Sequence, residues 1–462
     1  MTLIKNISGF RGTIGGKNNQ NLTPLDVVSS IAAFSLLIKE KNPNNKKITV
    51  IVGRDGRKSG MLIHNIVNST FSSMGINIID VGLSTTPTVC WGVLNNDCEA
   101  GLMITASHNP EDYNGLKFFD SEGEFLSKND VTKLIEYSEL ESFSFNQNIS
   151  LGTISQYNKM IDDHVEAIVK LNILPIKKMK KLNLFVIADA INSGGALAIP
   201  KLLEKLNVRF KIINKDIKGV FNHTPEPLAE NLKDLSNEIV KEKADFGFAV
   251  DPDVDRLVFF DEKGVIMGEE YTQVFCSDFV LSQNLGNTVS TLSSSNALKD
   301  LTSSYGSNYY STPVGEMNVV KKMKEVNSVV GGEGGGGIIY PDLHYGRDAL
   351  VGVALFIALL VKKESKVSLL KNDYPEYFMK KLKISMKNHK VIDSAFKEIL
   401  KKYSDLNPNT EDGIRINFKD SWVHMRKSNT EPIIRIFSES DTQKKADDVA
   451  IKIQNEILSL ID

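Results

Sequence analysis

Gly101-Leu102-Met103-Ile104-Thr105-Ala106-Ser107-His108-Asn109-Pro110 is the stretch that decides the fold. Its first four residues form an apolar run that predicts a short buried strand, and the Asn-Pro pair favours a turn directly after it. Ser107 is therefore expected on a tight loop at the carboxyl end of a strand, where open α/β sheets place their ligand chemistry. A serine before Asn-Pro also commonly caps a turn, so the segment 105–110 alone leaves a purely structural role open for this serine.

The chain on both sides of this loop alternates strand-like runs with amphipathic helical patterns, which is typical of α/β crossover units. Beyond the opening stretch, strands are expected at residues 47–52, 76–81, 182–188, 246–250, 288–292 and 328–330. Helices are expected at residues 26–38, 59–74, 157–171, 196–206, 272–283 and 318–325. The polar stretch 142–155 is interpreted as a linker.

The pattern of predicted strands and helices changes after Lys362. Alternating strands at 413–418, 421–426 and 432–438 precede a closing helix at 443–460, which predicts a small α+β domain. The predicted fold class is therefore α/β, with three similar mixed-sheet domains and a smaller C-terminal α+β domain. The expected domains are residues 1–150, 151–256, 257–370 and 371–462.

Composition limits the class of protein. Hydrophobic residues make up 41% and charged residues 24% of the 462 residues, and 55 basic side chains nearly balance 57 acidic ones. No strong field therefore favours nucleic acid or an anionic membrane. Three scattered cysteines argue against a disulfide framework or a structural zinc site. The N-terminus lacks the apolar core of a signal peptide and residues 349–361 are too few to span a bilayer, so a cytoplasmic protein is expected.

The segment Asp251-Pro252-Asp253-Val254-Asp255-Arg256 carries the second signal. Three carboxylates at alternate positions after a strand would repel one another, and a divalent cation that prefers oxygen ligands, such as Mg²⁺, relieves this repulsion. An EF-hand loop does not fit, because Arg256 stands where that loop requires glycine and the next residues form a strand-like run. A solvated acidic turn is the structural alternative.

Glycines surround Glu333 in the segment 330–338. They let the backbone approach a ligand closely, and the single carboxylate can accept hydroxyl protons. No Gly-Lys-Ser/Thr follows, which excludes a P-loop, while a flexible linker remains the alternative.

The segment Arg426-Lys427-Ser428-Asn429-Thr430-Glu431-Pro432-Ile433-Ile434-Arg435 gathers cations, hydroxyls and an amide on one turn. This combination is suited to a phosphate dianion, and a plain polar hairpin is the alternative.

Weaker signals lie elsewhere in the chain. Arg11 stands among glycines and belongs either to the floor of an active site or to a surface turn. In the segments 53–57 and 344–348, an Asp/Arg ion pair that holds a loop is the expected role. No function is assigned to the isolated histidines His64, His164, His389 and His424.

The four strong segments, in this order, make the chain resemble the α-D-phosphohexomutase family over its whole length. The stretches Asn222-His223-Thr224-Pro225-Glu226-Pro227 and Asn114-Gly115-Leu116-Lys117 match as well. The resemblance implies domains around a central cleft and an enzyme that interconverts hexose 6-phosphate and hexose 1-phosphate. It also implies a phosphoserine enzyme, a 1,6-bisphosphate intermediate, one Mg²⁺ per active site and sugar phosphates as partners, in a monomer or homodimer that binds neither nucleic acid nor membrane.

The resemblance also implies roles for individual residues. Ser107 would carry the phosphoryl group, and Asp251, Asp253 and Asp255 would bind Mg²⁺ beside it. Arg11 and Lys117 would steer proton transfer and charge at the reacting hydroxyl. The implied substrate-binding residues are Arg256, Glu333, Glu316 and His108, and the implied phosphate-binding residues are Arg426, Ser428, Asn429, Thr430 and Arg435.

One departure from the family pattern bears on the substrate. Many bacterial relatives carry Gly-Glu-x-Ser-Gly-His where this chain has Gly335 and Gly337 in place of the serine and the histidine, and Glu316 stands where some relatives have histidine. The glycine-rich form resembles archaeal-type phosphoglucosamine mutases and their bacterial relatives more than it resembles phosphomannomutase/phosphoglucomutase enzymes. Conversion of glucosamine 6-phosphate to glucosamine 1-phosphate is therefore expected, with a phosphoglucomutase/phosphomannomutase as the alternative and a non-catalytic sugar-phosphate-binding relative as the remoter one.

Overall fold

A computed structural model of the protein describes residues 1–45, 47–140, 142–385, 389–428 and 433–461. The chain divides into two compact units. Unit 1 comprises residues 1–283 and 335–368, and unit 2 comprises residues 284–334 and 369–462. Each unit is described by itself.

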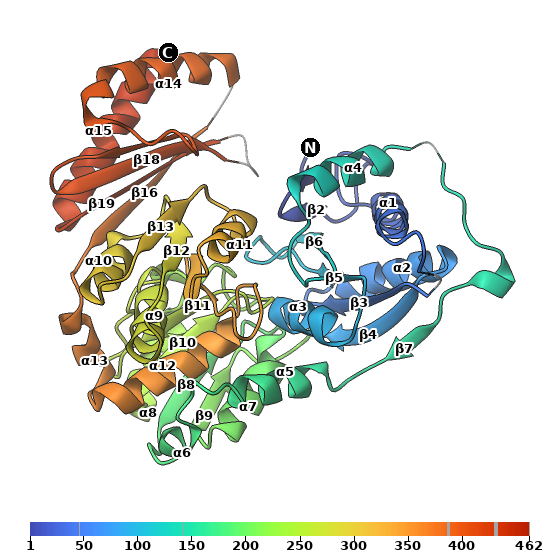
Figure 1. Ribbon diagram of the computed structural model, residues 1–462, viewed down its shortest axis with the longest axis horizontal. Coiled ribbons are helices and arrows are strands. Elements are labelled where there is room, and N and C mark those ends of the chain that lie inside the picture. The colour runs from blue at the N-terminus through green and yellow to red at the C-terminus, as the bar shows by residue number, and fades with distance from the viewer. Residues whose placement is uncertain (46, 141, 386–388, 429–432, 462) are drawn as a thin grey trace. The chain divides into compact units, whose positions relative to one another are not determined.

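Unit 1 begins with a seven-stranded mixed sheet (Figure 1). In sheet order, its strands are β1 (Ile4–Asn6), β2 (Gly9–Thr13), β6 (Tyr113–Phe119), β5 (Ala100–Ile104), β3 (Thr49–Arg54), β4 (Asn77–Leu83) and β7 (Ile154–Gln156). Strands β5, β3, β4 and β7 run parallel, whereas β1, β2, β6 and β5 pair antiparallel in turn. β5 is buried along its whole length, as its apolar run predicts.

Helices cover both faces of this sheet. On one face, α1 (Pro24–Lys41), α2 (Gly60–Ser73) and α4 (Lys128–Ser138) enclose the larger core, and on the other α3 (Thr86–Asn95) encloses a smaller one. Thr23 caps the N-terminus of helix α1, and its side chain forms a capping box with Asp26. The structure thus has the layered α/β arrangement that the sequence predicts.

The second sheet of unit 1 has the strand order β11-β10-β8-β9. Its strands are β11 (Leu257–Phe260), β10 (Phe246–Val250), β8 (Phe185–Asp189) and β9 (Arg209–Ile213). The accompanying helices are α5 (Met160–Val169), α6 (Ile176–Met179), α7 (Gly195–Lys205) and α8 (Lys233–Glu242). The buried strand β10 ends directly before Asp251, so the sheet delivers the acidic segment at the carboxyl end of a strand.

The remainder of unit 1 consists of α9 (Tyr271–Gln283), the short strand β15 (Gly337–Ile339) and α12 (Ala349–Lys363). The apolar run 349–360 of α12 is fully buried, and Phe356 stacks on Phe259 of β11 with ring centroids 3.8 Å apart. This run is thus the core helix of a globular unit. Among the helices in the described part of the chain, none combines the length and apolar character that a membrane crossing requires.

Unit 2 contains two sheets. In the first, β12 (Thr288–Thr291) pairs in parallel with β13 (Tyr309–Thr312) and β14 (Val330–Glu333). In the second, β16 (Phe378–Ser385), β19 (Ile433–Ser440), β18 (Ser421–Lys427) and β17 (Ile414–Asn417) are antiparallel. The main helices of this unit are α10 (Asn296–Ser304), α11 (Glu316–Glu325), α14 (His389–Lys402) and α15 (Gln443–Ile461).

Both units also contain short helical turns, at η1 (Asn148–Ser150), η2 (Ala229–Asn231), α13 (Val367–Leu370), η3 (Lys371–Asp373) and η4 (Ser404–Leu406).

The predicted linker at 142–155 is only partly a linker. Its last residues enter β7, which adds a parallel edge strand beside β4. The side chains of this strand are exposed, so its sequence lacks the apolar run by which the buried strands were predicted.

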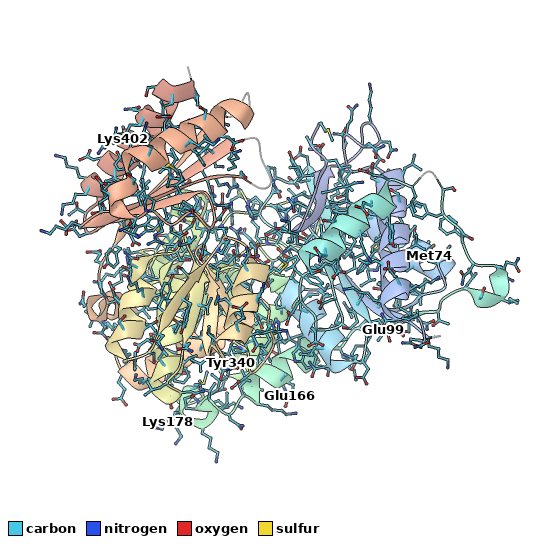
Figure 2. All side chains as sticks on the ribbon, turned by 45° about the horizontal axis from the view of Figure 1, so that its top comes forward. Met74, Glu99, Glu166, Lys178, Tyr340 and Lys402 are labelled. Atoms are coloured by element: carbon cyan, nitrogen blue, oxygen red, sulfur yellow. The ribbon has the colours of Figure 1, made fainter. Side chains whose placement is uncertain are left out.

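The surface carries charges of both signs. Figure 2 shows charged side chains such as Glu166, Lys178 and Lys402 on the outside of the helices or turns that carry them. Several pair locally, including Lys402 with Glu456 at 2.8 Å and Lys205 with Glu166 at 2.8 Å. Basic side chains that bind an anion must therefore be gathered at a local site.

Candidate active site

Ser107 lies on the loop that follows β5 and is buried. Its backbone adopts the left-handed conformation (φ 50°), and its amide donates a hydrogen bond to Thr105 Oγ1 at 2.8 Å. The Ser107 hydroxyl donates to Asp251 Oδ2 at 2.7 Å. The loop thus directs this hydroxyl at the acidic segment, although the two lie 144 residues apart in the sequence.

The serine loop is held by Arg57, whose side chain is fully buried. Arg57 donates to Asp55 Oδ2 at 3.1 Å, which confirms the ion pair predicted for the segment 53–57. Its Nη atoms also donate to the carbonyls of Ser107 (2.6 Å), Asn109 (2.7 Å), Pro110 (2.6 Å) and Tyr113 (2.9 Å). Asp55 in turn accepts from Thr105 Oγ1 at 2.7 Å. One buried guanidinium therefore fixes the backbone at the candidate nucleophile and after it, and its partner Asp55 holds the side chain of Thr105 before it.

The three aspartates that follow β10 form a buried cluster. Asp251 Oδ1 accepts the backbone N–H groups of Asp255 and Arg256, each at 3.1 Å. Burial, together with the charges of Asp255 and Asp253, raises the pKa of Asp251 well above its usual value. The strand β11 begins at Leu257, immediately after the segment, which confirms the rejection of an EF-hand.

Two cations compensate part of this negative charge. Lys117 Nζ donates to Asp253 Oδ2 at 2.6 Å and to Asp255 Oδ2 at 2.7 Å. Burial alone would raise the pKa of Asp255, but the charges of Arg347 and Lys117 lower it below its usual value. Burial alone would lower the pKa of Lys117, but Asp253 and Asp255 raise it above its usual value. Lys117 is therefore an ammonium ion at neutral pH, which holds its proton and can donate hydrogen bonds.

The acidic cluster fits a bound cation. The Oδ1 atoms of Asp253 and Asp255 are buried and have no hydrogen-bond partner among the described residues. Asp251 contributes a further carboxylate, and ligand oxygens of all three aspartates lie within 4.8 Å of one another. Such a set of buried oxygens, two of them unpaired, is a donor set for a hard divalent ion.

The other site residues predicted in unit 1 lie around the serine loop. Arg11 donates to Asn109 Oδ1 at 3.2 Å, and His108 Nδ1 lies 3.4 Å from Ser107 Oγ. Burial, followed by the charges of Arg256 and Arg11, lowers the pKa of His108 well below its usual value. His108 is therefore neutral near pH 7. Since Arg256 Nε is buried without a hydrogen-bond partner among the described residues, it remains available to an anionic ligand.

Arg347 has a different ion-pair partner from the one that the sequence pattern predicts. It was expected to pair with the neighbouring aspartate in the segment 344–348, but its Nη2 donates to Asp255 Oδ2 at 2.8 Å. A Cβ atom added to Gly337 would lie 2.3 Å from Arg347 Cδ. The absent side chain at residue 337 and the arginine ten residues later thus share one space, a dependence that the sequence pattern alone does not reveal.

In unit 2 the predicted sugar residues come close together in the fold. Glu333, at the end of β14, accepts the backbone N–H of Gly315 at 2.9 Å through Oε1. Gly315 precedes Glu316, the first residue of α11. The loop that carries Glu316 is thus adjacent to the glycine-rich turn that carries Glu333.

The predicted phosphate loop joins β18 to β19. Arg426 and Arg435 are directly opposite each other in the pairing of these strands, so the two guanidinium groups share one face. Ser428 donates its backbone N–H to Ile433 at 2.8 Å and lies at the end of the described part of the loop. Burial lowers the pKa of Arg426, an effect that Asp412 opposes. Asn429 and Thr430 lie outside the described residues.

His424, on β18, links two other segments of unit 2. Its Nδ1 lies 2.8 Å from Ser293 Oγ, and its Nε2 lies 2.5 Å from the carbonyl of Asp412. The carbonyl can only accept, so Nε2 carries the proton and Nδ1 accepts from the serine. Burial lowers the pKa of His424 to about 4, although Asp412 opposes the shift and Arg415 and Arg426 add to it.

The stability of unit 2 is expected to fall as the pH falls from about 6.5 to about 4. His424 is neutral in the folded state over this range but binds a proton in the unfolded chain, so its contribution is complete above pH 6.5 and disappears as the pH falls through its folded pKa of about 4. A shift of this size corresponds to roughly 3 kcal/mol. Urea unfolding between pH 7.5 and 4, followed with a spectroscopic probe placed in residues 369–461, measures this change in the free energy of unfolding. His424→Gln, which does not titrate, should flatten the profile in this range, and an unchanged slope in this variant would contradict the assignment.

Family models match the chain in four consecutive segments. The matched descriptions are phosphoglucomutase/phosphomannomutase alpha/beta/alpha domain I (residues 3–144), domain II (162–264), domain III (268–377) and the C-terminal domain (382–456).

Individual relatives extend over nearly the whole chain. A phosphoglucomutase/phosphomannomutase of Thermococcus kodakarensis is 35% identical over 97% of this chain and 98% of its own length. A phosphoglucosamine/phosphogalactosamine mutase of Sulfurisphaera tokodaii is 31% identical over 98% of both chains. A crystal structure of a phosphoglucomutase/phosphomannomutase family protein from Burkholderia thailandensis superimposes with a TM-score of 0.83 at 25% identity, covering 99% of this chain and 96% of that chain.

Proposed function

Because the chain belongs to the phosphoglucomutase/phosphomannomutase family, the α-D-phosphohexomutases, we propose that it converts glucosamine 6-phosphate to glucosamine 1-phosphate. The chain is a phosphohexomutase, an isomerase that moves a phosphoryl group between two positions of a hexose. The proposed reaction proceeds through a phosphoserine and a hexose 1,6-bisphosphate. The observation that carries it is the 2.7 Å contact between Ser107 Oγ and Asp251 in the buried acidic cluster.

Ser107 is the proposed phosphoryl carrier. In the first transfer, the bond between Ser107 Oγ and phosphorus breaks while the free hydroxyl of the sugar monophosphate forms a bond to phosphorus. That hydroxyl loses its proton, and the released Ser107 oxygen takes up one proton and becomes a hydroxyl again. The bisphosphate then turns over, and its other phosphoryl group returns to Ser107, which releases the isomeric monophosphate. A loop fixed by backbone hydrogen bonds suits both transfers, since each requires the same attacking and leaving atom in the same place.

The family uses a metal ion, and Asp251, Asp253 and Asp255 are its proposed ligands in this chain. The three donors are carboxylate oxygens, a set that suits Mg²⁺ better than softer metals. When bound, the ion would offset negative charge on the transferring phosphoryl group. The Oδ1 atoms of Asp253 and Asp255, which have no hydrogen-bond partner in the described part of the chain, support this proposal.

Charged residues around Ser107 have proposed roles in the transfer. Lys117, which stays protonated, and Arg11, which is anchored on the serine loop, can stabilise the charge that develops on the reacting oxygens. Neutral His108 can accept a hydrogen bond from a sugar hydroxyl, and Arg256 can bind an anionic oxygen. Arg347 holds Asp255 in its ionised form.

Residues of unit 2 are proposed to bind the rest of the substrate. Glu333 would accept hydrogen bonds from sugar hydroxyls. Arg426 and Arg435, whose guanidinium groups share one face of the β18–β19 hairpin, would bind the phosphate that is not being transferred, together with Ser428. Two neighbouring guanidiniums can bind either phosphate of the bisphosphate, which the turnover of that intermediate requires.

An amino sugar is the proposed substrate for an electrostatic reason. Glucosamine carries an amino group that can be protonated, and an ammonium is favoured beside carboxylates. Glu316 stands where some relatives have histidine, and its loop is adjacent to the Glu333 turn. The name of the Sulfurisphaera tokodaii relative, a phosphoglucosamine/phosphogalactosamine mutase, agrees with this choice.

A coupled assay with glucosamine, glucose and mannose 6-phosphates, each primed with its 1,6-bisphosphate, tests the proposal. The kcat/KM for glucosamine 6-phosphate is expected to exceed the other two by about 10-fold or more, equivalent to about 1.4 kcal/mol. Glu316→Gln should reduce this preference while it leaves turnover of glucose 6-phosphate nearly unchanged, because only the amino sugar loses an ionic contact.

Two outcomes of this assay would overturn the proposal in different ways. A preference for glucose or mannose 6-phosphate would retain the chemistry and establish the phosphoglucomutase/phosphomannomutase alternative. Turnover of none of the three would favour a non-catalytic sugar-phosphate-binding protein, and the absence of phosphorylation at Ser107 after exposure to the bisphosphates would support that result.

A further inference from the structure

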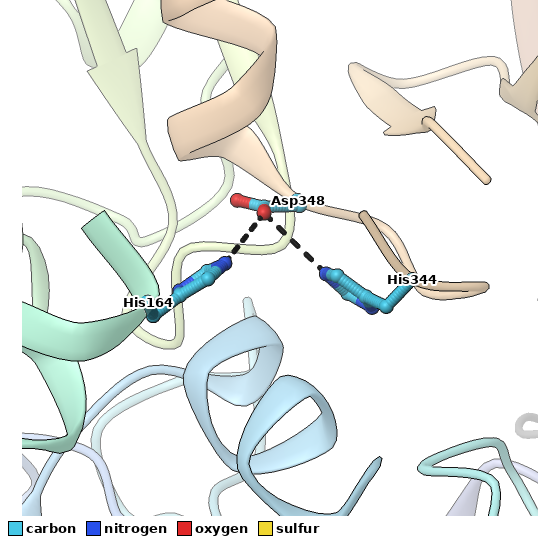
Figure 3. A group of neighbouring side chains, drawn as sticks. All are labelled: His164, His344 and Asp348. Carbon is cyan, nitrogen blue, oxygen red and sulfur yellow. Dashed lines mark hydrogen bonds and ion pairs between the residues drawn. The ribbon is translucent and has the colours of Figure 1, made fainter. Parts of the chain in front are cut away.

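A second cluster of metal-ligating side chains lies in unit 1, apart from the acidic cluster (Figure 3). His164 comes from α5, and His344 and Asp348 come from the segment directly before α12. The Nε2 atoms of the two histidines lie 3.1 Å (His164) and 3.4 Å (His344) from the same oxygen, Asp348 Oδ2. All three residues are buried, and their ligand atoms lie within 4.8 Å of one another.

Each side chain of the cluster is oriented by its surroundings. Asp348 caps α12, and its Oδ1 accepts the N–H groups of Leu350 (2.8 Å) and Val351 (3.2 Å), which leaves Oδ2 for the imidazoles. His164 Nδ1 lies 3.1 Å from Thr88 Oγ1, and Trp91 stacks on its ring with centroids 5.6 Å apart. His344 Nδ1 is buried without a hydrogen-bond partner among the described residues, so within the described part of the chain the only polar contact of this ring is the one with Asp348.

A hydrogen bond explains the contact of His344 poorly. The 3.4 Å separation of His344 Nε2 from Asp348 exceeds the usual range for an N–H···O bond, whereas the 3.1 Å separation of His164 lies within that range. Two donors bound to one tetrahedral ion at bonds of about 2.0–2.1 Å are about 3.3 Å apart. The observed separations lie on either side of that value.

We propose that His164, His344 and Asp348 form a second metal site, which binds a divalent transition ion of the Zn²⁺ class. Two imidazoles and one carboxylate select such an ion over Mg²⁺, whereas the three carboxylates of the acidic cluster prefer the hard ion. In the bound state His164 would donate Nδ1–H to Thr88 Oγ1, an outer contact that orients a ligating imidazole.

The second site would act on the active site through Arg347. Asp348 follows Arg347, whose guanidinium donates to Asp255 of the acidic cluster at 2.8 Å. An ion that joins α5 to the segment before α12 would therefore fix the base of the arginine that compensates this cluster. The proposed role is structural, and it is independent of the sugar that the enzyme prefers.

Cobalt substitution tests the proposal on the full-length protein. After chelation, Mg²⁺ is supplied in large excess to occupy the acidic cluster, and Co²⁺ is added as the probe. We expect one retained equivalent of Co²⁺ by elemental analysis and the visible absorption bands of four-coordinate cobalt. His164→Gln and His344→Gln keep an N–H donor opposite Asp348 but should lose this equivalent, with affinity reduced by more than about 100-fold, the upper range for loss of an outer contact. Thr88→Val should weaken binding by about 10-fold.

His64→Gln is the matched control, because His64 is buried and faces one carboxylate, Asp80, at 2.9 Å, without a second imidazole. It should bind Co²⁺ as the wild type does. Zn²⁺ should also raise the melting temperature of the wild type but not of the two glutamine variants. The proposal is overturned if the wild type retains no cobalt under excess Mg²⁺, or if the glutamine variants retain it with an unchanged spectrum. Should a glutamine variant fail to fold, Asp253→Asn, which weakens the acidic cluster alone, must still bind the equivalent.

Discussion

Alanine in place of Ser107 is expected to reduce mutase turnover by at least about 10⁴-fold, because the variant has no oxygen that can carry the phosphoryl group. The fold of the loop should survive. The amide of Ser107 donates to Thr105, and its carbonyl accepts from Arg57 at 2.6 Å, so neither contact uses the hydroxyl. The measurement is the initial rate with a sugar 6-phosphate and its bisphosphate, together with the intact mass after incubation with the bisphosphate. The wild type should gain one phosphoryl group, and Ser107→Ala none.

Ser127→Ala provides the control for this experiment. Ser127 caps α4 and accepts the N–H of Asp130 at 3.2 Å, so its loss costs about 1 kcal/mol of stability but removes no group of the serine loop. Its turnover should match the wild type well below the melting temperature. Near-normal turnover in Ser107→Ala would refute the assignment of Ser107 as the carrier, whatever the mass measurement shows.

The elements that the sequence predicts best are those with one strong pattern. β10 is present at 246–250 as predicted, and β5 forms the strand expected before Ser107, because a buried strand between turn residues shows itself as an uninterrupted apolar run. β7 was mistaken for the end of a linker because its side chains are exposed. The short β1 and β2 were also missed. They carry few apolar residues: β2 is specified by pairing with β6, a partner about 100 residues away in the chain, and β1 in turn by pairing with β2.

The candidate site shows the same limit at the level of side chains. Alternate aspartates after a strand predicted a cation site, and the residues do lie together in a buried cluster. What the pattern cannot supply is the partner of each charge. Arg347 was assigned to its neighbour Asp348 because adjacent charges are visible in a sequence, but its partner is Asp255, 92 residues earlier. Asp348 instead faces two histidines: His164, to which the sequence assigns no function, and His344, which belongs to the loop segment 344–348.

Arg57 gives the second large expected effect. Methionine in its place should destabilise unit 1 by about 3–5 kcal/mol, since it leaves the buried carboxylate of Asp55 without its cation and the carbonyls of the serine loop without their donor. Turnover should also fall by about 100-fold or more at temperatures where the variant is folded, because a displacement of roughly 1 Å at the nucleophile is enough for this. Urea unfolding measures the first effect, and kcat measured well below the melting temperature measures the second.

Two further variants separate the positioning role of Arg57 from simple destabilisation. Arg209→Met removes an exposed guanidinium at the start of β9 that lies over the ring of Phe185 at 5.4 Å, so it should change neither stability nor kcat appreciably. Asp55→Asn combined with Arg57→Met removes the uncompensated buried charge and should recover part of the lost stability. Its kcat should stay low, because the carbonyl of Ser107 still lacks the donor that fixes the loop. Recovery of kcat in parallel with stability in this double variant would show that Arg57 serves the fold alone and does not position the nucleophile.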